Sequence, residues 1–132
     1  MRKSILSIFP YRTDTSGNTF PVVPIALEYA GKKREFVALV DSGASISVFR
    51  GEIAEILAIP IENGEETFLG GVGGRIKGYI HRVKVEIAGK RFVCPIVFSY
   101  EYLVSVNLLG RQEFFKKFRI IFEEQKRRII LN

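Results

Sequence analysis

Alternation of apolar and polar residues is the feature that most limits how this chain can fold. Val83, Val85 and Ile87 alternate with charged residues, the turn Ala88-Gly89-Lys90 follows, and the alternation resumes at Phe92. Side chains at this spacing point to opposite faces of a strand, so that one face is buried. Similar runs separated by turn residues recur along the chain and favour an all-β fold.

The predicted elements are short. We expect strands near residues 5–9, 19–29, 35–40, 82–87, 92–98, 118–122 and 128–131. Pro21 and Pro24 lack backbone donors and make the second of these an edge strand or a bent one. Turn residues at 30–33 and 123–126 predict hairpins. Helical spacing predicts only two short helices, at Ile53, Ile56 and Leu57 and at Phe114, Phe115 and Phe118.

Composition limits the classes of protein. The 132 residues suit a single domain over 1–132, and 47% are apolar, which is enough for a core. Cys94 is the only cysteine and His81 the only histidine, so we expect no internal disulfide, metal site, cofactor or Ser-His-Asp triad. No run is long enough for a membrane span or a signal peptide, and we expect a cytoplasmic protein.

The net charge of +6 raises the question of a nucleic-acid partner. The basic residues are scattered in short groups at 32–34, 116–117 and 126–128, and we interpret them as solvated faces. A basic β-domain that stacks bases on exposed aromatic residues is the third hypothesis for function. Alternation assigns most aromatic residues to the core, so we do not expect nucleic acid to bind.

Only two aspartates occur in the chain. Asp14 lies in a polar stretch typical of a turn, whereas Asp41 follows the apolar run 36–40 and precedes Ser42, Gly43 and Ala44. A carboxylate at the end of a buried strand is costly unless it is hydrogen-bonded or used. One interpretation is an Asx-turn that ends the strand. The other is a functional carboxylate held by the turn.

Two further segments carry unusual residues. Leu69-Gly70-Gly71-Val72-Gly73-Gly74 lacks the spacing of a phosphate-binding or dinucleotide-binding loop and reads as a hairpin tip. It could close over a ligand or be an ordinary glycine-rich turn. Leu108-Leu109-Gly110-Arg111 is a strand-to-helix junction in which glycine allows close packing and arginine can tie loops together.

In this order, the three segments resemble the retropepsin family of aspartic proteases over residues 19–131. The glycine segment is similar to the flap of retroviral proteases, and the C-terminal residues are similar to the closing hairpin of cellular and transposon-derived members. The resemblance implies a closed or partly open β-barrel of retropepsin type with one or two short helices, active as a two-fold dimer.

The resemblance also implies roles for individual residues. Asp41 would be the catalytic carboxylate, and Ser42 would join the active-site loops of two subunits. Gly43, with Ala44 and Ser45 after it, would complete that loop and line the cleft. The flap would be formed by Leu69, Gly70, Gly71, Val72, Gly73 and Gly74. The support beneath the loop would come from Leu108, Leu109, Gly110 and Arg111.

The chain departs from the retroviral pattern at Ser45 and at its C-terminal strand, and Ala44 bears on the pH optimum. Retroviral members usually carry a second aspartate where this chain has Ser45, so the partner of Arg111 is open. The C-terminal strand reads as a hairpin, so the dimer interface can differ from the viral one. Ala44 has no hydroxyl to stabilise an ionised pair of carboxylates, which predicts a pH optimum nearer mildly acid or neutral than strongly acid.

Counting carboxylates predicts the assembly. Aspartic proteolysis needs two, and this chain offers only Asp41 in a suitable context. The leading hypothesis is therefore a homodimeric aspartic endopeptidase that cleaves peptides or unfolded proteins beneath two flaps. The alternative is a catalytically silent retropepsin-fold module that binds peptides or only dimerises.

Overall fold

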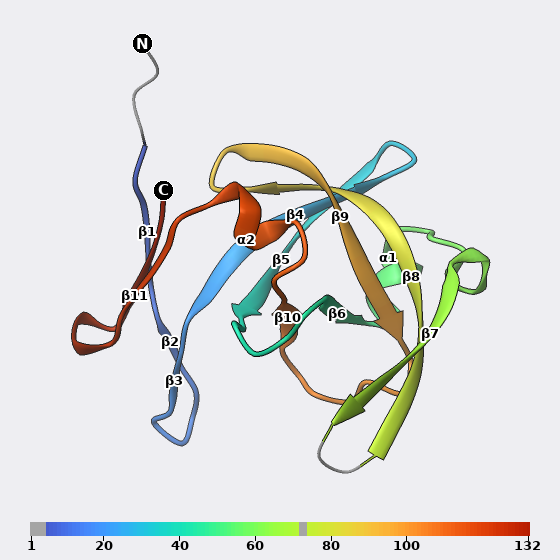
Figure 1. The fold of residues 1–132 in the computed structure, drawn as a ribbon, viewed down its shortest axis with the longest axis horizontal. Helices are drawn as coiled ribbons and strands as arrows, with labels where there is room; N and C mark the ends of the chain where they lie inside the picture. The colour runs from blue at the N-terminus through green and yellow to red at the C-terminus, as the bar shows by residue number, and fades with distance from the viewer. Residues whose placement is uncertain (1–4, 72–73) are drawn as a thin grey trace.

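The computed structural model describes residues 5–71 and 74–132, and it is an all-β fold (Figure 1). The N-terminal strands are β1 (Ser7–Pro10), β2 (Arg12–Thr13), β3 (Thr19–Phe20), β4 (Val22–Tyr29), β5 (Lys32–Val40) and β6 (Ser47–Arg50). Then come β7 (Glu65–Gly71), β8 (Gly74–Ile87), β9 (Lys90–Ser99), β10 (Asn107–Leu109), β11 (Ile120–Glu123) and β12 (Arg128–Leu131). The helical elements are α1 (Gly51–Ile56), α2 (Phe114–Lys117) and the 3-10 turns η1 (Ile61–Asn63) and η2 (Glu124–Lys126).

Seven strands form the main sheet, in the order β4-β5-β10-β6-β9-β8-β7. A further pairing of β4 with β8, through Ala26 and Glu86 and through Leu27 and Val85, joins the sheet into a ring. Most pairs are antiparallel, but β10 runs parallel to β5 and β6 runs parallel to β9. Figure 1 shows the strands of this ring, with β7 running alongside β8.

The hairpin turns between long strands follow from glycine. Ala30 and Gly31 connect β4 to β5 with φ of 47° and 83°, and Ala88 and Gly89 connect β8 to β9 with φ of 48° and 81°. Two successive residues with positive φ make the tight turn whose twist matches that of paired strands. The turns predicted at 30–33 and 88–90 are confirmed as hairpins.

The interpretation of residues 19–29 as a bent strand is confirmed, and the edge-strand interpretation holds for the first half of β4 among the described strands. The chain breaks at Pro21 between β3 and β4, and β4 then pairs with β5 along its whole length. Residues 26–28 also pair with β8, so this half of β4 has two neighbours. Pro24 pairs only with β5 among the described strands, and its missing N–H therefore costs no ladder bond.

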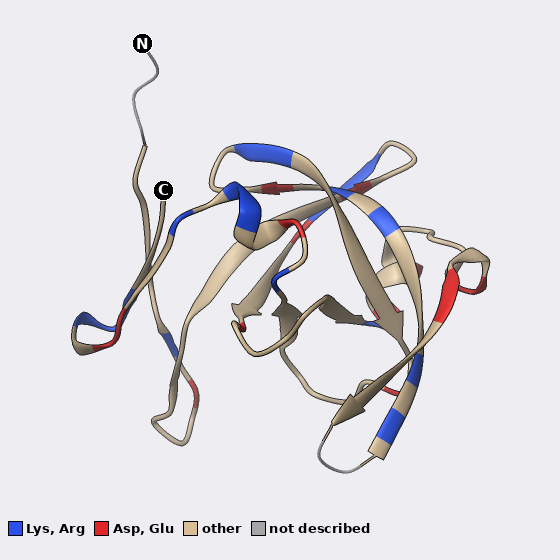
Figure 2. Cartoon of the chain, viewed as in Figure 1, with Lys and Arg blue, Asp and Glu red and all other residues tan. Residues whose placement is uncertain are grey.

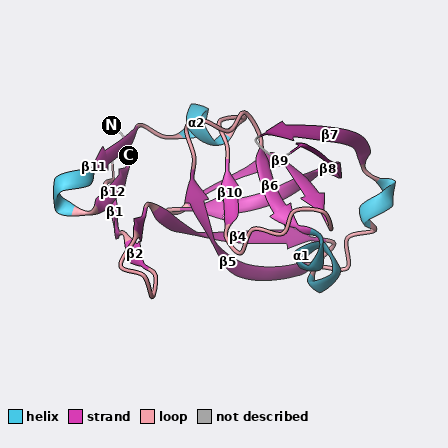
Figure 3. Cartoon of the chain, turned by 90° about the horizontal axis from the view of Figure 1, so that it is seen from below, coloured by secondary structure: helices cyan, strands magenta, loops and turns pink. Residues whose placement is uncertain are grey.

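A small three-stranded sheet, in the order β1-β12-β11, contains the first and the last of the described strands. The predicted C-terminal hairpin is confirmed: β11 and β12 pair from Ile120 opposite Leu131 to Glu123 opposite Arg128. Figures 1 and 3 show this sheet at one end of the molecule, with the β7–β8 hairpin toward the other end.

The core has two parts. The larger cluster fills the ring and includes Phe49, Phe98, Phe114 and Leu109, each fully buried. The smaller cluster is centred on Val48, Val97 and Tyr102, and partly buried apolar residues pack against it. The smaller cluster contains residues of β6, β7, β8 and β10, so it lies beneath the β7–β8 hairpin.

Both predicted helices occur. α1 contains Ile53 and Ile56, and α2 contains Phe114 and Phe115, whereas Phe118 follows α2 in extended conformation. Neither helix approaches the length and apolar character of a membrane span, and the same holds for every helix among the described residues.

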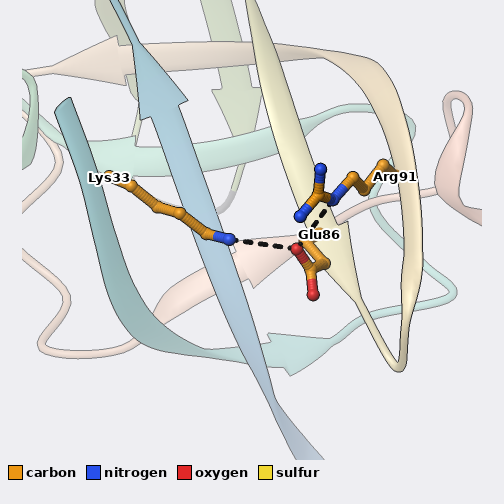
Figure 4. A network of polar contacts seen from close by, with 3 residues as sticks. All are labelled: Lys33, Glu86 and Arg91. Atoms are coloured by element: carbon orange, nitrogen blue, oxygen red, sulfur yellow. Dashed lines mark hydrogen bonds and ion pairs between the residues drawn. The ribbon is translucent and has the colours of Figure 1, made fainter. Parts of the chain in front are cut away.

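Charged side chains are distributed over several elements (Figure 2). At the seam between β4 and β8, Glu86 accepts a hydrogen bond from Lys33 Nζ at 3.0 Å and from Arg91 Nε at 3.1 Å (Figure 4). These donors, Lys33 first, lower the pKa of Glu86. All three side chains are solvated, so the network contributes little to stability.

Candidate active site

Asp41 lies at the carboxyl end of two neighbouring parallel strands. Val40, the last residue of β5, pairs with Leu109 of β10. The N–H of Asp41 then donates to Leu109 O at 2.9 Å, which continues the ladder by one bond. The apolar run before Asp41 thus forms an inner strand, and its partner β10 fixes where the carboxylate emerges.

The residues after Asp41 form a tight turn around its side chain. The N–H of Gly43 donates to Asp41 Oδ1 at 2.9 Å, and the N–H of Ala44 donates to Asp41 O at 3.2 Å. A Cβ on Gly43 would lie 3.2 Å from the same carboxylate oxygen, so glycine keeps the approach uncrowded. The Asx-turn interpretation is therefore correct as local geometry, and it leaves the use of the carboxylate open.

The Leu108–Arg111 segment packs beneath this turn. Backbone N–H groups of Arg111 and Gln112 donate to Ala44 O and Ser45 O, each at 2.9 Å. The N–H of Gly110 donates to the buried Ser47 Oγ at 3.0 Å. A Cβ at Gly110 would lie only 2.5 Å from the carbonyl carbon and oxygen of Ile46, so only glycine fits.

Arg111 supports the loop through its backbone. Its side chain is exposed and forms no ion pair with any residue in 5–71 or 74–132. Ser45, whose carbonyl accepts from the neighbouring Gln112 N–H, offers the guanidinium no carboxylate.

A cleft of about 430 Å³ opens beside Asp41. The described residues that line it are Asp41, Gly43, Ala44, Ser45, Ile46, Val48, Leu69, Gly70, Gly71, Gly74, Ile76, Tyr102 and Leu108. Nine of these belong to the three segments singled out in the sequence, so the fold brings those segments to one place. Ser42, Leu109, Gly110 and Arg111 do not line the cleft, and Val72 and Gly73 lie outside the described residues.

The β7–β8 hairpin forms one wall of the cleft. Leu69 and Ile76 are paired across the two strands, and both line the cleft. Their neighbours Phe68 and Arg75 point the other way, where the guanidinium carbon lies 4.6 Å from the ring centroid. The hairpin therefore has an apolar face toward Asp41 and an aromatic and charged face away from it.

Sequence reasoning missed four lining residues: Ile46, Val48, Ile76 and Tyr102. Tyr102 is buried, and its hydroxyl donates to Val106 O at 2.6 Å. Burial first, and then the negative charge of Asp41, raises the pKa of Tyr102. Alternation at Ile46 and Val48 was the available signal for two of them, whereas Tyr102 lies in an irregular segment without one.

Other concave regions do not contain the predicted residues. A pocket of about 310 Å³ lies over the seam with Lys33, Glu86 and Arg91, and no described residue of the three segments lines it. Within the described residues, no group of three or more His, Cys, Asp or Glu side chains is placed to hold a metal ion. The cleft beside Asp41 is therefore the candidate site.

Neither a protein-family model nor a curated protein matches the chain.

Proposed function

We propose that this chain is the subunit of a homodimeric aspartic endopeptidase of retropepsin type. The single observation that carries the proposal is that the Asp41 turn and the β7–β8 hairpin line the same cleft. A carboxylate on one wall and a glycine-bearing hairpin on the other are what an extended peptide needs in order to be held and attacked. In this proposal the ring of strands is a partly open β-barrel.

Chemistry requires a second carboxylate, and a second copy of the chain supplies it. Asp14, the other aspartate, lies in an exposed turn between β2 and β3, where it accepts hydrogen bonds from Ser16 and Asn18. A two-fold axis between two Asp41 turns brings two equivalent carboxylates together. Two like charges at short distance favour sharing one proton between them.

The two Asp41 carboxylates together account for every proton transfer in the reaction. The ionised Asp41 takes a proton from a water held between the carboxylates, and the water oxygen bonds to the carbonyl carbon of the peptide. The protonated Asp41 of the other chain gives its proton to the carbonyl oxygen. When the tetrahedral intermediate collapses, the C–N bond breaks, the nitrogen takes the proton from the first Asp41, and a hydroxyl of the intermediate returns a proton to the second Asp41, which regenerates the pair.

The walls of the cleft favour an apolar peptide in extended conformation. Ile46, Val48, Leu69, Ile76 and Leu108 supply apolar contacts for its side chains. Gly70, Gly71 and Gly74 leave the backbone of the hairpin accessible for main-chain hydrogen bonds, as when a peptide adds to a strand. Unfolded or exposed protein segments therefore fit as substrates.

The test compares two conservative substitutions. Asp41→Asn keeps the size and the acceptor for Gly43 N–H but removes the carboxylate, so cleavage of a denatured protein should fall below detection. The matched control Asp14→Asn makes the same change in the other aspartate turn and should leave cleavage unchanged. Both proteins are assayed from pH 3 to pH 8, with and without a pepstatin-like inhibitor.

The outcomes separate the candidates. Full activity of Asp41→Asn would contradict the assignment. Peptide binding by the wild-type protein without turnover at any pH would favour the silent peptide-binding or dimerisation module instead. A rate profile that peaks at or below about pH 3 would contradict the inference from Ala44, because that optimum lies about a unit below the pKa of a free aspartate.

A further inference from the structure

The β7–β8 hairpin extends beyond the end of its pairing with β9. β8 pairs with β9 only from Tyr79, opposite Phe98, to Ile87. Its pairing with β7 continues to Gly74, so residues 74–78 of β8 have β7 as their only ladder neighbour among the described strands. Backbone groups of β8 that face away from β7 in this stretch need partners from elsewhere.

Side chains at the end of β9 and just after it supply those partners at Lys77. The N–H of Lys77 donates to Glu101 Oε1 at 3.0 Å, and the Lys77 carbonyl accepts from Ser99 Oγ. The N–H of Glu101 in turn donates to Ser99 Oγ at 3.1 Å. Two side chains thus occupy the place of a further strand residue and hold both backbone groups of one hairpin residue.

The adjacent residue fixes where the hairpin leaves the body. Gly78 is buried, and a Cβ there would lie 2.5 Å from Val97 Cγ1 and 3.0 Å from Phe98 O. β8 therefore passes directly against β9 at Gly78, and Lys77 is bound one residue further along. Toward the tip, Ile76 and Leu69 rest on the apolar cluster that contains Tyr102.

We propose that Glu101 and Ser99 are positioning residues that hold the β7–β8 hairpin in the position in which it lines the cleft beside Asp41. Glu101 precedes Tyr102, which lines the cleft and is itself tied to Val106 O. The same short segment therefore sets one wall of the cleft and clamps the other. Loss of the clamp lets the hairpin pivot at Gly78 away from the carboxylate, and the significance of this for catalysis rests on the proposed function.

Hydrogen exchange followed by mass spectrometry tests the clamp. Glu101 is exposed, so Glu101→Ala should fold, and the exchange of β7 amides, Glu65–Gly71, should become about tenfold faster. β7 does not touch Glu101 in the hydrogen-bond pattern, so a change there reports movement of the whole hairpin. Glu101→Gln keeps an oxygen acceptor for Lys77 N–H and should restore most of the protection.

The matched control is Glu66→Ala. Glu66 is a glutamate of the same hairpin and forms an exposed ion pair with Lys77 Nζ at 3.5 Å, but it does not bind the Lys77 backbone. Its removal should leave exchange of the hairpin near the wild-type rate. Equal exchange in Glu101→Ala and Glu66→Ala, or failure of Glu101→Gln to restore protection, would overturn the clamp.

Kinetics with a peptide substrate give the second readout. Glu101→Ala should raise KM about tenfold with little change in kcat, because bound peptide closes the hairpin again. Repeating the exchange measurement in an Asp41→Asn background separates the two proposals. Faster exchange there supports the clamp even if the chain cleaves nothing, whereas unchanged exchange overturns the clamp even if the chain is a protease.

Discussion

The two aspartate turns of this chain share one hydrogen bond and differ in nearly everything around it. Asp14 Oδ1 accepts the N–H of Ser16 and Asp41 Oδ1 accepts the N–H of Gly43, each at 2.9 Å. The Asp14 turn joins β2 and β3, which pair over only two residue positions, and residues 12–18 are exposed. The Asp41 turn ends an inner strand and is hydrogen-bonded to Leu109 of β10 and to the backbone of Arg111, in a segment that the Ser47 hydroxyl supports through Gly110.

The difference shows that an Asx-turn does not by itself indicate whether its carboxylate has a function. Asp14 has both carboxylate oxygens occupied within its own turn, by Ser16, by the Asn18 N–H and by Asn18 Nδ2. Asp41 uses one oxygen for its turn and faces a cleft lined by another hairpin. What distinguishes the functional candidate is the support beneath the turn and the space beside it.

Glycine substitutions give the largest expected contrast between the turns. Gly110→Ala would put a Cβ 2.5 Å from the Ile46 backbone beneath the Asp41 turn, and we expect a loss of about 3 kcal/mol in the free energy of unfolding. Gly17→Ala in the Asp14 turn has φ of +85° and open space, so only the cost of left-handed backbone applies, about 1 kcal/mol. Urea unfolding measures both, and equal losses would contradict the account.

The reactivity of Cys94 tests whether solvent can reach the residues packed beneath the Asp41 turn. Its sulfur lies 3.8 Å from Gln112 O, and burial raises the pKa of the thiol to about 11. At pH 8 the folded protein should react with a thiol reagent about a hundredfold more slowly than a free cysteine. Rapid labelling of the folded protein would show that this base is open.

The same shift predicts a stability change with pH. Below pH 9 the Cys94 thiol is protonated in both states; between about pH 9 and pH 11 it ionises only in the unfolded chain. The unfolded state is then favoured, so stability falls by up to about 3 kcal/mol as the pH rises through this window. Cys94→Ala should lack this part of the loss of stability. An identical loss in that variant would contradict its attribution to the Cys94 thiol.

A smaller effect is expected from serine. Ser47→Ala removes the acceptor of the Gly110 N–H and leaves a buried donor unpaired, which should cost about 1–2 kcal/mol. Ser16→Ala changes an exposed side chain in the Asp14 turn and should cost less than about 0.5 kcal/mol. Thermal or urea unfolding compares them, and a Ser16→Ala loss as large as that of Ser47→Ala would mean that the two turns have similar support.

Removal of the Asp14 carboxylate itself should also have only a small effect. Asp14→Ala removes the hydrogen bonds to Ser16 and Asn18, which are exposed, and should cost about 0.5–1 kcal/mol. Peptide cleavage at saturating substrate should be unchanged. Loss of cleavage in a folded Asp14→Ala protein would give this turn a part in the site that the single chain does not suggest.

Much of the fold could be predicted because its longest strands are joined locally. Ala30-Gly31 and Ala88-Gly89 mark the tight turns, and alternation along β8 and β9 marks the buried face. The short strand β6 escaped prediction because its partners are distant in the sequence and it has too few residues for a period. The junction at Leu108–Arg111 indicated a strand at β10, but not its parallel pairing with β5. The second neighbour of β4 also depends on a pairing about 60 positions away in the sequence, which local pattern cannot reveal.

The candidate site divides in the same way. Asp41, the glycine hairpin and Gly110 stand out in the sequence because their residue types are unusual at those positions. The Ser47 hydroxyl beneath Gly110 and the Glu101 carboxylate on Lys77 do not, because each binds a backbone N–H far along the chain. Side chain to backbone bonds of this kind carry no residue pattern that sequence reasoning could use.

The central claim is that one Asp41 is half of a site, and mixed dimers test it most directly. Wild-type and Asp41→Asn chains are unfolded together in equal amounts, refolded at a fixed total concentration, and assayed for peptide cleavage. If each site needs Asp41 from two chains, random pairing makes only about a quarter of the dimers fully wild-type. The mixture should then have about a quarter of the activity of pure wild-type protein at the same total concentration. Activity of about a half would show that each chain carries a complete site and would contradict the account.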